Sequence, residues 1–199
     1  MKIHYAFYAV GIVATWATCA PLQATTLEST GGSAMPSFAA TKPGVSMCAK
    51  ATNIVFSCPL AHSQKIVSIC ASDDVEDGKA RFYYAYGRPG APELTYPNDG
   101  PSQDGAFTRT HLVFGSNTGG YAYGFTNNGY KYTVYSISGE RDLQSGGVIV
   151  QRTGSSKALT KMDCQVGRIT ETNNDAIIDA TLRWKSDGAI EASGLPLTH

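Results

Sequence analysis

The first 24 residues constrain this chain most, because they decide the compartment in which the rest of it folds. The segment MKIHYAFYAVGIVATWATCAPLQA begins with one basic residue, Lys2, continues with an apolar run from about Tyr5 to Thr18, and ends in small residues. This order is typical of a secretory signal peptide. The apolar run is shorter than the roughly 20 residues that a membrane-spanning helix needs. We therefore predict a signal peptide over residues 1–24 and a periplasmic or secreted protein.

The cleavage site gives the first testable prediction. Cleavage after Ala24 places a small residue at the position before the cut, as signal peptidases require. The alternative is a lipoprotein acylated at Cys19, but Trp16 and Thr18 stand where such a signal has leucine and a small residue. Mass spectrometry of the exported protein should show an N-terminus close to Thr25. A retained, lipid-modified Cys19 would contradict this.

Four cysteines remain after such a cleavage: Cys48, Cys58, Cys70 and Cys164. An even number in an exported chain predicts two disulfides, and four cysteines allow three pairings. A zinc site would need close pairs such as C-x2-C; none is present, so we predict no metal. We expect Cys164 to bond to one of the three early cysteines. The favoured pairing is Cys48 with Cys58, which closes a short loop, and Cys70 with Cys164, which ties the last strand to an early one.

Length and charge bound the classes of function. Removal of residues 1–24 leaves 175 of 199 residues, enough for one domain, which we assign to residues 46–199. The remaining 15 basic and 16 acidic residues nearly cancel, which argues against nucleic acids and anionic membranes as partners. No second long apolar run occurs, so no transmembrane anchor is expected. Residues 25–45 are small and polar without periodicity, and they predict a flexible arm.

Short runs of strand-forming residues alternate with turns after residue 46. Strands are predicted over residues 53–58, 65–71, 81–86, 93–96, 148–152 and 158–164. Pro92 and Pro97 should keep the fourth of these at a sheet edge, because proline cannot donate to a strand ladder. The last two strands should form a hairpin around a Gly-Ser-Ser turn.

The period changes near the C-terminus. The segment DAIIDATLRWK, residues 175–185, has apolar residues four apart and predicts one amphipathic helix. Asn173 or Asn174 can cap its start, and Gly188 can end it. The predicted fold class is therefore all-β, an antiparallel partly open barrel or a sandwich with one C-terminal helix.

The clearest local pattern is a tyrosine-rich hairpin over residues 121–137, YAYGFTNNGYKYTVYSI. Its Asn-Asn-Gly centre accepts the positive φ values of a tight turn, and alternation places the tyrosines of each arm on one face. Tyrosine rings suit carbohydrate stacking and protein interfaces. The candidate binding residues are therefore Tyr121, Tyr123, Tyr130 and Tyr132. The alternative is that they fill the core face of a sheet, because aromatic residues form strands well.

The segments FSC, KIVSIC, YAYG, ELTYP and GGYAYGFTNNGYKY, then Cys164 and the end ASGLP, follow one another between residues 48 and 196. In this order they resemble a family of small exported bacterial proteins with no established activity. The resemblance implies an exported scaffold and transfers no catalytic residue. A looser likeness, at the level of fold class, is to the periplasmic lysozyme inhibitors, which are small disulfide-bearing β-barrels.

No catalytic motif stands out. His111 lies in the strand pattern RTHLVF without a G-x-S-x-G motif, and the acidic run at 73–77 lacks the spacing of a calcium loop. No cofactor is expected. We predict an exported non-enzymatic binding protein, of which an inhibitor or immunity protein is one form, acting on a protein or glycan of the cell envelope. The alternatives are a cell-envelope hydrolase that uses His111 and a purely structural envelope protein. A hydrolase should place His111 beside a carboxylate or hydroxyl in a cavity, and a binder should expose an aromatic patch.

Overall fold

A computed structural model describes residues 45–50, 52–77, 79–101 and 105–197. The predicted signal peptide, and the predicted arm up to residue 44, lie outside these ranges. The strands of the described ranges are β1 (Thr52–Pro59), β2 (Ile66–Ser72), β3 (Phe82–Arg88), β4 (Ala91–Tyr96), β5 (Thr108–Val113), β6 (Gly119–Asn127), β7 (Tyr130–Ser138), β8 (Gln144–Arg152), β9 (Ala158–Asp163) and β10 (Thr170–Glu171). The α-helices are α1 (Asp175–Leu182) and α2 (Gly188–Ser193). None of the helices in the described part of the chain is long and apolar enough to cross a membrane.

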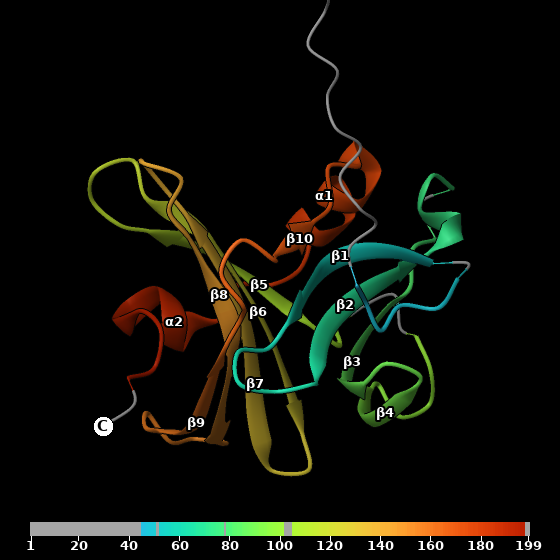
Figure 1. The fold of residues 1–199 in the computed structure, drawn as a ribbon, viewed down its shortest axis with the longest axis horizontal. Coiled ribbons are helices and arrows are strands. Elements are labelled where there is room, and N and C mark those ends of the chain that lie inside the picture. Colours follow the sequence, from blue (N-terminus) through green and yellow to red (C-terminus); the bar gives the residue numbers. More distant parts are fainter. Residues whose placement is uncertain (1–44, 51, 78, 102–104, 198–199) are drawn as a thin grey trace, which may run out of the picture. The chain divides into compact units, whose positions relative to one another are not determined.

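The strands form two five-stranded antiparallel sheets (Figure 1). The first sheet has the order β10-β1-β2-β3-β4, and the second has the order β5-β6-β7-β8-β9. The predicted all-β class is confirmed, and of the two architectures expected, the sandwich is the one formed. The segment between two prolines, β4, lies at an edge as predicted, and β8 and β9 pair as the predicted second hairpin.

One core lies between the two sheets, and Phe125 is near its centre. The ring centroid of Phe125 on β6 lies 4.8 Å from that of Tyr84 and 4.4 Å from that of Tyr96, both in the first sheet. Phe107 and Trp184 stack nearby with centroids 5.2 Å apart. Burial of such large apolar rings supplies the main driving force for sheet packing.

The predicted tyrosine hairpin is confirmed, and its register decides where the tyrosines point. Asn128 and Gly129 have φ values of 49° and 79°, which a two-residue hairpin turn requires. The register pairs Tyr123 with Val134 and Phe125 with Tyr132. Directly paired residues share a face of a sheet, so the aromatic sets of both arms lie on the inner face of the second sheet.

Both predicted disulfides form, but the favoured pairing is wrong. The structure joins Cys48 to Cys70 and Cys58 to Cys164. The register of β1 and β2 explains this, because it pairs Ser57 with Ser68 and therefore turns Cys58 to the face opposite Cys70. Cys58 lies in the core, where it meets Cys164 beyond the end of β9. Cys70 faces away from the second sheet and meets Cys48.

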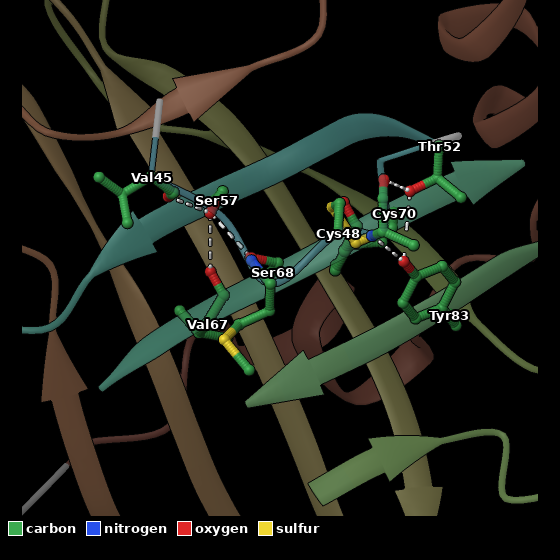
Figure 2. The surroundings of a disulfide bond; sticks show 11 residues. Val45, Cys48, Thr52, Ser57, Val67, Ser68, Cys70 and Tyr83 are labelled. Carbon is green, nitrogen blue, oxygen red and sulfur yellow. Dashed lines mark hydrogen bonds between the residues drawn. A yellow bond between two sulfur atoms is a disulfide. The ribbon is translucent and has the colours of Figure 1, made fainter. Parts of the chain in front are cut away.

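Residues 45–50 lie across the outer face of the first sheet, as Figure 2 shows. Besides the Cys48–Cys70 disulfide, hydrogen bonds to side chains of the strands hold this segment, among them those from Ser57 Oγ to the carbonyl of Val45 (3.1 Å), from the amide of Met47 to Ser68 Oγ (3.0 Å), and from the amide of Ala49 to the hydroxyl of Tyr83 (2.8 Å). Hydroxyl groups on β1, β2 and β3 thus satisfy the backbone of a segment that has no strand partner.

The C-terminal segment forms two helices rather than one. Asn174 caps α1 as predicted, since its Oδ1 accepts from the amides of Ala176 (2.9 Å) and Ile177 (3.2 Å). The helix ends at Leu182, before the predicted residue 185, and Gly188 begins α2 instead of ending a helix. Six residues are too few to show a helical period, so α2 was missed. Ile190 is the buried residue of α2. It packs on the outer face of the second sheet in an apolar cluster with Leu112, Ala122, Tyr135 and Ile149.

Candidate functional site: the Arg109 cavity

The structure divides the four candidate tyrosines among different places. Tyr123 is buried at 4% exposure, and Tyr121 is half-buried beside it. Tyr132 is half-buried and stacks on Phe125, with ring centroids 4.9 Å apart. Only Tyr130, next to the hairpin turn, is exposed, at 36%. The four therefore do not form one exposed aromatic patch, and the core-filling alternative describes Tyr123 and Tyr132 better.

Tyr121 and Tyr123 line a cavity of about 220 Å³, which we call the Arg109 cavity. Its walls come from β1 and β10 of the first sheet, from β5, β6 and β7 of the second sheet, from α1, and from Thr172 between β10 and α1. Its polar lining residues other than tyrosine are Arg109, Ser136, Ser138, Glu171, Thr172 and Thr181. The cavity thus joins one cation, one carboxyl group and several hydroxyl groups from both sheets and α1.

Arg109 is the most unusual residue of this cavity. It is placed on the inner face of β5 by its pairing with Tyr123, and it is only 8% exposed. Its guanidinium carbon lies 3.8 Å from the ring centroid of Tyr121 and 6.0 Å from that of Tyr123. Its Nε and Nη1 atoms are buried and have no hydrogen-bond partner. No carboxylate of the described residues lies within ion-pair distance of it.

A buried guanidinium without an ion pair destabilises the fold unless another group stabilises its charge. A buried charge without an ion-pair partner costs several kcal/mol, of which the two tyrosine rings and the more distant Glu171 carboxylate offset only a part. Arginine cannot escape the cost by losing its proton, because the guanidinium group stays protonated in proteins. A negatively charged group in the cavity would offset the cost. The arrangement is therefore suited to binding an anion.

Glu171 lines the same cavity from the edge strand β10. The residue as a whole is exposed, yet the packed chain around its carboxyl group raises the pKa of that group by removing water. Ser136 and Arg109 lie close enough to oppose this rise in pKa. Burial likewise raises the pKa of the Tyr123 hydroxyl to about 12, so Tyr123 remains a neutral hydrogen-bonding group at any physiological pH. Glu171 is therefore the group at the cavity whose charge can change near acidic pH.

His111 does not meet the requirement set for a hydrolase. It lies on the same face of β5 as Arg109 but is exposed, and its ring stacks on Tyr121 with centroids 5.2 Å apart. It is not a lining residue of the Arg109 cavity. Neither a hydrogen bond nor an ion pair links His111 to another described residue. The described part of the chain also lacks any group of three or more metal-ligating side chains.

Tyr132 lines a second hollow, of about 380 Å³, together with Tyr84, Tyr86, Glu93, Leu94, Val150 and Met162. Two of its polar groups, on Tyr86 and Glu93, already have partners. The Tyr86 hydroxyl donates to the sulfur of Met162 (3.6 Å), and Glu93 pairs with Lys65 (2.7 Å). The charged group of this hollow is thus already paired, whereas the positive charge of the Arg109 cavity has no ion-pair partner among the described residues.

The sequence identified the two tyrosines of the cavity but not the residues that give it its charge. Arg109 and His111 are two residues apart on β5 and lie on the same face of the strand. No pattern in the sequence of β5 indicates that Arg109 is buried, so its role could not be predicted. Comparison with protein-family models, curated proteins and solved structures gave no match to this chain. The chemistry of the Arg109 cavity is therefore the basis on which a function can be assigned.

Proposed function

We propose that this chain is an exported, non-enzymatic binding protein that captures an acidic glycan of the cell envelope in the Arg109 cavity. The observation that carries the proposal is the buried guanidinium of Arg109, whose Nε and Nη1 lack partners. Export is supported by the signal-peptide pattern of residues 1–24, and by two disulfides, which persist in oxidising compartments such as the periplasm or the extracellular space.

The lining of the cavity favours a glycan over an acidic peptide. Ser136, Ser138, Thr172 and Thr181 line the same cavity, and hydroxyl groups can donate to and accept from sugar hydroxyls. Tyr121 and Tyr123 also line the cavity, and each ring combines an apolar body with a polar tip. At about 220 Å³ the cavity is smaller than the roughly 300–1,000 Å³ pockets that enclose drug-sized molecules. It is therefore suited to one charged sugar unit, such as a terminal or branch residue, rather than to a long stretch of chain.

The substitution Arg109→Met tests the proposal through binding and stability together. We expect the affinity for oligogalacturonide to fall at least about tenfold, since charge-assisted hydrogen bonds contribute about 1.5–3 kcal/mol. We expect the free energy of unfolding to stay the same or to rise by about 1–2 kcal/mol, because an unpaired buried charge is replaced by an apolar side chain. Calorimetry and urea denaturation measure the two effects.

The matched control is Arg152→Met, which removes an exposed arginine from the end of β8 and should leave both quantities unchanged. Neutral dextran oligosaccharide and a poly-glutamate peptide serve as control ligands. Binding of the peptide without binding of oligogalacturonide would replace the glycan with a protein partner. A loss of more than about 3 kcal/mol of stability in Arg109→Met would identify Arg109 as a structural residue and overturn the proposal.

A further inference from the structure

We infer that the group captured in the Arg109 cavity is a singly charged carboxylate, and that Glu171 makes its capture proton-linked, so that binding strengthens as the pH falls. This inference rests on the proposed function. It adds the charge of the ligand group and the control of the site by pH. The geometry behind it is the presence of one cation and one carboxyl group, Arg109 and Glu171, on the walls of one small cavity without an ion pair between them.

The charges of the lining residues favour a ligand group with a single negative charge. The lining contains one permanent positive charge, on Arg109, and one negative charge, on ionised Glu171. At neutral pH a phosphate ester carries nearly two negative charges, which together with ionised Glu171 would leave the site with an excess of about two negative charges and so disfavour binding. A carboxylate brings only one negative charge. If Glu171 takes up a proton, the carboxylate and Arg109 neutralise each other, and the protonated carboxyl group of Glu171 can donate a hydrogen bond to the ligand.

No other titratable group among the described lining residues of the cavity reverses this effect. β5 contributes Arg109, and β6 contributes Tyr121 and Tyr123. The contributions of β1, β7 and α1 are Val55, Ser136 with Ser138, and Ile178 with Thr181, none of which titrates. His111 is the one further group to consider, because it lies beside the cavity and stacks on Tyr121.

The direction of the pH effect follows from these groups. Ionised Glu171 repels a carboxylate ligand, and protonation of Glu171 removes the repulsion. Because the pKa of Glu171 is raised from its ordinary value, this protonation takes place at a higher pH than for a solvated glutamate. Affinity should therefore increase as the pH falls through the Glu171 pKa. It should fall again only where the ligand's own carboxyl group becomes protonated.

The test uses three probes that share a sugar ring: glucuronate, glucose 6-phosphate and glucose. Calorimetric titration of the full chain between pH 4 and pH 8 should give binding of glucuronate that is stronger at pH 5 than at pH 7, and weaker binding of the other two. Titration in buffers of different ionisation enthalpy should show that a proton is taken up with glucuronate. Tighter binding of glucose 6-phosphate than of glucuronate would overturn the assignment of a carboxylate.

The decisive variant is Glu171→Gln, which keeps the shape of the side chain and mimics the protonated form. We expect it to bind glucuronate about tenfold more tightly than the wild type at pH 7, the equivalent of one pKa unit of interaction, and to lose the pH dependence. His111→Gln should keep the dependence, which assigns it to Glu171. A pH-independent wild type, or a Glu171→Gln variant with unchanged affinity, would overturn the inference while leaving the proposed function intact. Absence of glucuronate and oligogalacturonide binding at every pH would instead overturn the proposed function.

Discussion

Replacing Cys58 and Cys164 together by alanine should lower the free energy of unfolding by about 4–5 kcal/mol. The disulfide they form spans 106 residues, and closing a loop of about 100 residues stabilises a folded protein by about 4.7 kcal/mol in the chain-entropy model. It also fastens β1 of the first sheet to the end of β9 in the second, where the amide of Gln165 donates to the carbonyl of Pro59 (2.9 Å). Because small domains are stable by only about 5–15 kcal/mol, this variant should be close to unfolding at 37 °C. Urea denaturation of the disulfide-bonded protein measures the loss.

The other disulfide gives a matched control for this prediction. Cys48 and Cys70 are separated by 22 residues, so their joint replacement by alanine should cost only about 3 kcal/mol by the same reasoning. It should also release residues 45–50 from the outer face of the first sheet without loosening the contact between sheets. Proteolysis should therefore cut this variant first within that segment. Equal losses for both variants, or no loss for either, would show that loop closure does not determine the stability of this fold.

The outcome for the disulfides shows what a sequence does and does not specify. The number of cysteines and the export signal indicated two bridges, because that inference needs no geometry. The pairing depends on which face of the first sheet each cysteine occupies. The face of Cys58 relative to Cys70 follows from the β1–β2 register, which contains an irregularity between Ile54 and Phe56. A shift of one residue in register turns a side chain to the opposite face, so the pairing could not be read from spacing.

The hairpin around Asn128 and Gly129 could be predicted because its turn chemistry and its alternation are local. The face that its tyrosines occupy could not, since that face depends on the packing of the second sheet against the first. The Arg109 cavity could be predicted even less from the sequence. It combines residues from six strands and helices, among them β10, which has only two residues and no pattern of its own. Contacts between residues as far apart as Arg109 and Glu171 become visible only once both sheets are in place.

Replacing Phe125 by alanine should cost about 3–5 kcal/mol, the range for large aromatic residues in a close-packed core. Phe125 is 5% exposed, and its ring lies within 4.9 Å, between centroids, of the rings of Tyr84, Tyr96 and Tyr132. Truncation would leave a cavity at the contact between the two sheets. The loss can be measured by urea denaturation with a fluorescence readout, with the disulfides intact.

The control for this prediction lies in the same hairpin. Tyr130 stands on the same face as Phe125 but beyond the edge of the core, where it is 36% exposed. Tyr130→Ala should therefore change the free energy of unfolding by less than about 1 kcal/mol, as surface substitutions do. The pair of variants separates a core role from a surface role for the hairpin's aromatic face. If Tyr130→Ala cost as much as Phe125→Ala, the core would extend to the hairpin turn. If Phe125→Ala cost little, the two sheets would not depend on this aromatic cluster, and the position of Arg109 between them would lose its structural support.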